Sequence, residues 1–324
     1  MNEDLTQDRH RLLSEIADLY YNKGLSQQDI ADRVQMSRPS ISRLLLEARD
    51  FDIVEIKINH PIPTAPAIEE ELTKRFSLQS AHILERGIST DDDAFRNLGR
   101  LGAEVLYKYL QDDMIFGLSW GTTVHVVVQE LRPKRLPNVK VVQLLGGVGA
   151  PYSSIDGPEQ VRRSGEMLGA QHYYLNAPML VDSPDVASAL REDHSIKEVL
   201  ELVRQTDIAL VGIGSIIPEI STQYHSGYIT YENLRELSRV GAIGAICTSF
   251  FSLTGEHVTA AWCDDCSISI SWDELVKVPK LIGVAGGKMK APAILGAVRS
   301  GIVDILVTDD ATAQEILRID SEGL

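Results

Sequence analysis

The sequence predicts an α/β fold in two parts, a small helical domain at the N-terminus and a larger Rossmann-like domain built on a parallel sheet. The chain of 324 residues is long enough for two domains. Residues 59–66, NHPIPTAP, contain three prolines in eight positions, which is typical of an extended linker. After this linker, apolar runs that end in glycine alternate with helical patterns, as in parallel sheets covered by helices. We therefore expect domains at 1–58 and 67–324, joined by residues 59–66.

The N-terminal part carries three helical patterns in succession. Residues 9–22 place apolar side chains on one helical face. Ser26, followed three positions later by Asp29, is a signal for the start of a second helix. Ser37 is a second such cap, and the proline at position 39 then falls in the first turn, where its missing N–H does no harm. Residues 53–58, IVEIKI, alternate as a strand and would form a small wing.

Residues 26–49 have the spacing of a helix-turn-helix, with a short helix, a turn and a longer helix. The polar and basic side chains of the third helix lie opposite its aliphatic stripe, where they would reach base edges and phosphates in the major groove. The residues expected to contact double-stranded DNA are Gln27, Ser37, Arg38, Pro39, Ser40, Ser42 and Arg43. The net charge of −15 excludes a broad nucleic-acid-binding surface, but not one small basic element. A plain three-helix packing unit is the alternative.

The second part contains five apolar segments typical of parallel strands, each next to a glycine loop or a helix. The segments are 114–119, 139–145, 208–214, 281–285 and 304–308, and the helices expected beside them are 124–131, 196–204, 291–300 and 310–317. Ligands of such folds bind beyond the carboxyl ends of the strands. The glycine loops fall at those ends, so we expect the ligand site there.

The loop Ser119–Thr123, SWGTT, lies between a predicted strand and a predicted helix start. Backbone N–H groups and threonine hydroxyls at such a place form a cradle for an anion. The loop Gly286–Ala291, GGKMKA, follows another strand and adds cationic side chains. The alternative for the first loop is a helix cap with a glycine needed for packing.

Seven segments together resemble the SorC family of sugar-binding bacterial transcriptional regulators. They are LYYNKGLSQQDIA, MSRPSISRLLLEAR, GLSWGTT, VVQLLGG, DIALVGIGS, GAICTSFF and VAGGKMKAPAILGAV, and they span nearly the whole chain. The resemblance implies an effector domain similar to sugar-phosphate isomerases and deaminases, a phosphorylated sugar as effector, no cofactor, and a homo-oligomer, either dimer or tetramer. It also implies the effector-binding residues Ser119, Gly121, Thr122, Thr123, Gly146, Gly147, Gly286, Gly287 and Lys290. Cys266 stands where several relatives carry an arginine, which leaves the identity of the sugar open.

Two other functions remain as alternatives. The same regulator could respond to an unphosphorylated sugar or polyol, or the chain could be a sugar-phosphate isomerase or deaminase. An enzyme needs a general base, for which the candidates are Asp265, Asp309, His194 and His225. None of them lies in a catalytic motif, so we expect no catalysis.

Cys263 and Cys266 form a CxxC motif within an alternation that reads as a strand. Cys247 and His257 are the only nearby residues that could complete a zinc site, so neither a metal nor a redox role is expected. The chain contains no apolar stretch of membrane-spanning length and no signal peptide, so a cytoplasmic protein without membrane contact is expected.

Overall fold

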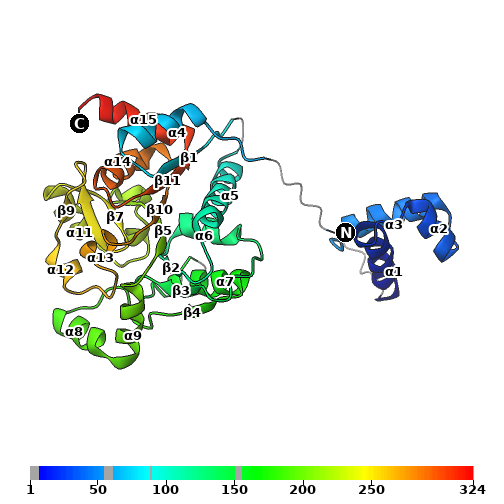
Figure 1. Cartoon of the computed structure of the whole chain (residues 1–324), viewed down its shortest axis with the longest axis horizontal. Coiled ribbons are helices and arrows are strands. Elements are labelled where there is room, and N and C mark those ends of the chain that lie inside the picture. Colours follow the sequence, from blue (N-terminus) through cyan, green and yellow to red (C-terminus); the bar gives the residue numbers. More distant parts are fainter. Residues whose placement is uncertain (1–6, 55–60, 88–89, 150–154, 324) are drawn as a thin grey trace. The chain divides into compact units, whose positions relative to one another are not determined.

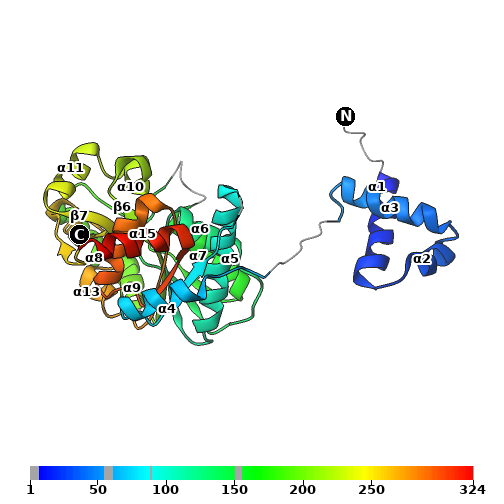
Figure 2. The ribbon, with the colours of Figure 1, turned by 90° about the horizontal axis from the view of Figure 1, so that it is seen from above.

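The computed structural model describes residues 7–54, 61–87, 90–149 and 155–323 (Figure 1). The chain divides into two compact units, residues 1–61 and 62–324. The larger unit is seen from a second direction in Figure 2.

The first unit consists of three helices around a small apolar core. Helix α1 (Gln7–Ala17) continues into a π-helical turn, η1 (Asp18–Asn22), and is followed by α2 (Gln27–Val34) and α3 (Arg38–Asp50). Ser26 and Asp29 form the predicted capping box of α2, and the Ser37 side chain accepts from the Ser40 N–H at the start of α3. The core is built from Leu13, Ile16, Leu19, Ile30, Ile41, Leu44, Leu45 and neighbouring alanines. These local signals in the sequence therefore predicted the helix starts correctly.

The strand expected at 53–58 is not tested by the structure. The N–H groups of Ile53 and Val54 both donate to the Ala48 carbonyl, which turns the chain back at the end of α3. Residues 55–58 lie outside the described residues.

The second unit is organised around a sheet of seven strands, all parallel, in the order β1-β11-β10-β5-β2-β3-β4. The strands are β1 (Ser80–Leu84), β2 (Ile115–Leu118), β3 (Lys140–Gln143), β4 (Gln171–Tyr173), β5 (Ile208–Gly212), β10 (Leu281–Val284) and β11 (Ile305–Asp309). The five strands predicted from the sequence correspond to β2, β3, β5, β10 and β11. The predicted parallel α/β fold is confirmed.

Helices cover both faces of this sheet. One apolar core joins α5 (Asp91–Tyr109), α6 (Thr122–Gln129) and α7 (Gly157–Leu168) to one face. The other core joins α4 (Pro66–Arg75), α9 (His194–Val203), α14 (Ala291–Arg299) and α15 (Asp310–Ser321) to the opposite face. Successive residues of a strand point to opposite faces, so Leu281 packs in the second core and Ile282 in the first.

A second, antiparallel sheet lies beyond the carboxyl end of β5. Its strands are β6 (Gly214–Ser215), β7 (Ala242–Ile246), β8 (Ser249–Ser252) and β9 (His257–Val258), in the order β6-β7-β8-β9. Short helices surround it: η2 (Pro218–Ile220), α10 (Thr222–His225), α11 (Tyr231–Arg239), α12 (Ala261–Asp264), α13 (Trp272–Leu275) and η3 (Lys288–Lys290). The remaining described helix, α8 (Pro184–Glu192), precedes α9.

The strand expected beside the CxxC motif is found only after the motif, as two isolated antiparallel bridges of Ser267 with Leu180 and of Ser269 with Leu145. Cys263 lies in α12, and the Asp264 carboxylate accepts from the Ala260 N–H at 2.7 Å, which turns the chain into a helix. The Cys263 thiol donates to the Thr248 carbonyl at 3.5 Å, and both motif cysteines are buried.

Candidate functional site

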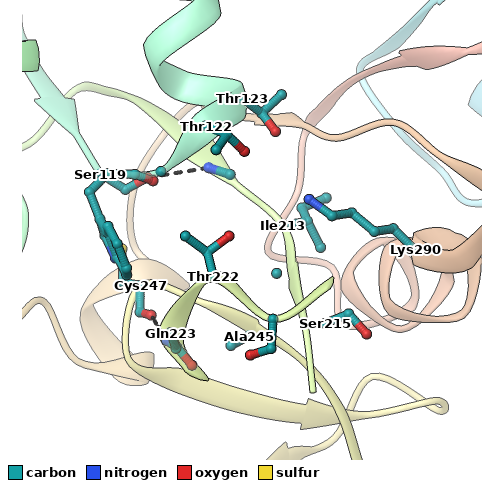
Figure 3. Close-up of a pocket in the computed structure, with 15 residues that line it drawn as sticks. Ser119, Thr122, Thr123, Ile213, Ser215, Thr222, Gln223, Ala245, Cys247 and Lys290 are labelled. Carbon is teal, nitrogen blue, oxygen red and sulfur yellow. Dashed lines mark hydrogen bonds between the residues drawn. The ribbon is translucent and has the colours of Figure 1, made fainter. Parts of the chain in front are cut away.

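A pocket opens where β2 and β5 end, and the antiparallel sheet and α10 close its other side (Figure 3). It is lined by Ser119, Trp120, Gly121, Thr122, Thr123, Gly212, Ile213, Gly214, Ser215, Ser221, Thr222, Gln223, Ala245, Cys247 and Lys290. Its volume is about 50 Å³. Since one water needs roughly 10–15 Å³, the space suits a few waters or one tetrahedral anion.

The N-terminus of α6 forms one wall of this pocket. Gly121 precedes the helix with φ of 108°, a conformation that favours glycine, and among the described residues no side chain caps α6. The first turn of a helix leaves its N–H groups without partners inside the helix and concentrates positive potential there. Thr122 and Thr123 begin the helix and both line the pocket, as Figure 3 shows. This wall therefore offers hydrogen-bond donors to an anion.

Two of the predicted donors are already engaged within the protein. The Gly121 N–H donates to the Ile155 carbonyl at 3.1 Å. The Ser119 hydroxyl oxygen accepts from the Gly212 N–H at 3.2 Å, which ties the end of β2 to the end of β5. Both residues line the pocket, and these bonds hold the backbone of its wall in place.

Lys290 reaches into the pocket from η3, on the side opposite Thr222 (Figure 3). In the part of the chain that the structure describes, its Nζ has no hydrogen bond or ion pair. Burial lowers the pKa of Lys290 because the charged amine is removed from water. A partly buried cation without a counter-ion is costly, so this geometry favours an anionic ligand beside it.

The opposite wall was not predicted from the sequence. It comprises Ser215, Thr222, Gln223, Ala245 and Cys247, from β6, α10, β7 and the turn after β7. The Gln223 amide donates to the Cys247 carbonyl at 2.9 Å. Cys247 has φ of 54°, and burial raises the pKa of its thiol to about 12. Two of the segments that resemble the family run through this wall, DIALVGIGS, which ends at Ser215, and GAICTSFF, which contains Ala245 and Cys247.

Gly146 and Gly147 do not line the pocket, contrary to the role expected for them. A Cβ at Gly146 would lie 2.5 Å from the backbone of residues 177 and 178, and the Gly147 N–H donates to the Ala177 carbonyl at 2.8 Å. A neighbouring segment of the chain occupies the space where a ligand was expected.

Gly286 and Gly287 also stand outside the pocket and instead line a separate hollow with Asp309. The Asp309 carboxylate accepts from the Gly287 N–H at 3.1 Å, the Thr312 N–H at 2.9 Å and the Thr312 hydroxyl at 2.9 Å. The Gly287 N–H also donates to the Thr312 hydroxyl oxygen at 2.8 Å, and its two bonds fix the loop between β10 and η3, the short helix that contains Lys290. Gly286 and Gly287 therefore affect the pocket through the position of Lys290.

The residues expected to contact DNA fall into three groups. Arg38, Pro39 and Arg43 are exposed on α3. Ser37 and Ser40 are bonded to each other at the helix start, with their hydroxyl oxygens 2.8 Å apart. The two remaining residues, Gln27 and Ser42, are partly buried.

The four candidate general bases do not gather at the pocket, whose described lining includes none of them. His194 is 90% exposed and lies 3.5 Å from Glu198. Asp309 caps α15, Asp265 ends α12, and His225 belongs to α10. Within the described ranges there is also no group of histidine, cysteine and acidic side chains that could hold a metal ion.

Comparison with known proteins defines the class. Residues 60–318 match the family described as "Putative sugar-binding domain". The chain is 30% identical over 313 residues to the deoxyribonucleoside regulator of Bacillus subtilis (strain 168), covering 97% of this chain and 99% of that protein. It is 32% identical over 317 residues to the transcriptional regulator LsrR of Enterobacter sp. (strain 638), covering 97% and 95%.

The full-length sorbitol operon regulator SorC from Klebsiella pneumoniae is similar in structure as well. Its crystal structure matches with a TM-score of 0.77 and 28% identity, over 98% of this chain and all of that one. The protein is therefore a transcriptional regulator with a sugar-binding domain. It belongs to the SorC family. None of the helices in the described ranges is long and apolar enough to cross a membrane.

Proposed function

We propose that the protein controls a carbohydrate catabolism operon in the bacterial cytoplasm and that a phosphorylated sugar is its effector. The N-terminal unit would bind operator DNA, and the pocket at α6 would bind the effector. One observation carries the choice of a phosphate: Lys290 lies in a pocket with uncapped N–H groups and has no counter-ion among the described residues. An uncapped helix start and an ammonium group together favour a multiply charged oxyanion.

The size of the pocket fits the phosphate group of such an effector. A volume of about 50 Å³ accommodates a phosphate group at Lys290, and the pocket would have to widen toward Ser215, Thr222 and Gln223 to admit the sugar. These residues offer hydroxyl and amide groups, the usual partners of sugar hydroxyls. Thr122 and Thr123 would each donate a hydroxyl to the phosphate.

The test is calorimetry with pairs of sugars and their phosphates, on the parent chain and on Lys290→Met. Removal of a hydrogen bond to a charged group costs about 1.5–3 kcal/mol, so the phosphate should bind roughly 10- to 150-fold more weakly to the variant. The unphosphorylated sugar should bind equally to both. Lys288→Met is the matched control, because Lys288 is exposed in the same short helix and does not line the pocket.

Two results would overturn the effector assignment. If the parent binds a free sugar as tightly as its phosphate, the unphosphorylated alternative replaces it. If the parent converts a sugar phosphate into a product, the isomerase or deaminase alternative replaces it.

For the DNA-binding part, α2 and α3 have the order and spacing of a helix-turn-helix, and α3 would enter the major groove. Arg38 and Arg43 are exposed on α3 and would contact base edges or phosphates. One such unit on a chain with net charge −15 has little basic surface, so we expect paired units from a dimer or tetramer. Half-sites should then lie about 10–10.5 bp apart, or multiples of this. Footprinting that shows a single isolated half-site would contradict the pairing.

A further inference from the structure

A second cavity, distinct from the effector pocket, lies between the antiparallel sheet and the helices α8, α9 and α13. Its volume is about 540 Å³, well within the range of about 300–1,000 Å³ for small-molecule sites. Its lining combines several serine and threonine hydroxyls with two arginines, three acidic residues, a histidine and a tryptophan. Such a lining suits a polar ligand.

Most of the charged groups in this cavity are already engaged. The Arg204 Nε donates to a Glu274 carboxylate oxygen at 2.8 Å. An Asp264 carboxylate oxygen accepts from the Ala260 N–H at 2.7 Å. Asp273 is exposed at the edge of the cavity.

Arg191 differs from these groups because it is anchored but not neutralised. Its Nη2 donates to the carbonyls of Asp264, Asp265 and Ser267 at 3.3, 3.2 and 2.6 Å. In the described part of the chain no carboxylate pairs with it, and its Nε and Nη1 donate to no protein atom. A guanidinium held in place with donors to spare is a binding group for a carboxylate.

His257 adds a second group without a partner. Its ring stacks on Trp272, with centroids 4.6 Å apart and planes at 12°. Its Nε2 is buried and, within the described ranges, has no hydrogen-bond partner. Buried polar atoms without partners are rare, and they often mark a site that a ligand or water completes.

We propose that this cavity is a second small-molecule site, for a small hydroxylated carboxylate. The carboxylate binds Arg191, and the hydroxyl groups bind Asp273 and the serine hydroxyls of the lining, such as Ser269.

The second site is adjacent to the effector pocket across a two-residue turn. Cys247 lines the effector pocket and Thr248 lines the second cavity, and together they connect β7 to β8. Each is held by its carbonyl, Cys247 by the Gln223 amide at 2.9 Å and Thr248 by the Cys263 thiol at 3.5 Å. A ligand that moves Thr248 therefore moves Cys247, so occupancy of one site changes the affinity of the other, and the effect is reciprocal.

The experiment is calorimetry of the full chain with gluconate, glycerate and tartrate as probes. Glucitol, which has the carbon skeleton of gluconate without the carboxylate, is the neutral control. At least one acid should bind at concentrations up to about 10 mM, ten times a millimolar Kd, while glucitol does not. Arg191→Lys should weaken that acid by about tenfold or more. Thr259→Phe, a change at an exposed residue of the lining, should place a phenyl ring at the edge of the cavity and weaken binding.

Several results would overturn the proposal. They are a failure of all three acids to bind the parent, equal binding of glucitol, or unchanged binding to both variants. Coupling is measured as the Kd of inorganic phosphate with and without the bound acid, and an identical Kd refutes the connection through the turn. Loss of phosphate binding in Lys290→Met tests the effector pocket alone, so the two sites can fail independently.

Discussion

Gly99 in α5 sets how closely α5 approaches α6, and Gly99→Ala should weaken both the fold and the effector site. A Cβ at Gly99 would lie 2.3 Å from the Val126 Cγ1 and 2.7 Å from the Val126 carbonyl oxygen. A side chain can rotate away, but the carbonyl belongs to the backbone of α6, so the helix itself must shift. Thr122 and Thr123 begin that helix and line the effector pocket.

The expected loss of stability follows from two opposing effects. Overpacking of a buried contact costs about 1–3 kcal/mol. Alanine is better than glycine in a helix by about 0.8–1.0 kcal/mol. We therefore expect a net destabilisation of about 1–2 kcal/mol for Gly99→Ala, since its two closest contacts are far shorter than normal ones. The shift of α6 should also weaken one charge-assisted hydrogen bond to the effector, which would raise the Kd of the effector about tenfold.

Urea denaturation measures the first effect, and calorimetry with the phosphosugar measures the second. Gly102→Ala is the matched control on the same helix, because a Cβ there would lie 2.6 Å from a Val127 methyl group and meets only side-chain atoms. Val127→Ala should rescue Gly102→Ala in a double-mutant cycle, whereas Val126→Ala should rescue Gly99→Ala only in part. Full rescue by Val126→Ala, or a Gly99→Ala variant with parental stability and affinity, would refute the argument that the carbonyl forces α6 to move.

Three further predictions concern other parts of the chain. Burial lowers the pKa of Lys290 in the folded state, so between the folded and unfolded pKa values the unfolded chain binds more protons, and stability relative to Lys290→Met should rise with pH in that range while effector affinity falls; a stability difference between the two chains that stays constant with pH in urea melts would show that the amine is fully solvated. Arg43→Ala should weaken operator binding by about 1–3 kcal/mol in gel-shift titrations. Arg49→Ala, an equal change of charge in the last turn of the same helix, should weaken it less. Equal losses of affinity in the two variants would contradict the proposal that the first half of α3 contacts the operator. The three cysteines are buried, and burial raises the pKa of Cys247 to about 12, so mass spectrometry should find little alkylation by iodoacetamide near neutral pH until the chain is unfolded; rapid labelling of Cys247 in the native state would contradict its burial.

The sequence predicted best what depends on near neighbours in the chain. Ser26 and Asp29 cap α2 because three residues suffice to build that structure. The strands ending before Ser119 and Gly286 were recognisable because parallel strands buried on both faces are continuously apolar. The loops that contain Thr122, Thr123 and Lys290 were recognisable because each follows such a strand, and the family resemblance indicated the individual residues.

The sequence failed where contacts between distant segments decide the outcome. The antiparallel sheet has strands of two to five residues, too short to produce a clear periodicity. Gly146 follows a strand just as Gly286 does, but residues 177 and 178 pack against it, and nothing in the local sequence reveals that approach. Gln223 and Cys247 reach the pocket only through the fold of that second sheet.

The carboxylate of Asp309 has a consequence for how fast and how tightly the effector can bind. It accepts one hydrogen bond from the Gly287 N–H in the loop before Lys290 and two from Thr312, whose hydroxyl oxygen also accepts from the Gly287 N–H, so this loop is ordered before any ligand arrives. The conformational entropy of placing the lysine is then lost during folding and does not reduce the free energy of binding. Asp309→Asn would replace a charged acceptor with a weaker one, and the loop would gain freedom in the unliganded protein. In the variant only some of the loop conformations would be able to bind the effector. Its association rate should therefore fall, even though the contacts between protein and effector in the complex are unchanged.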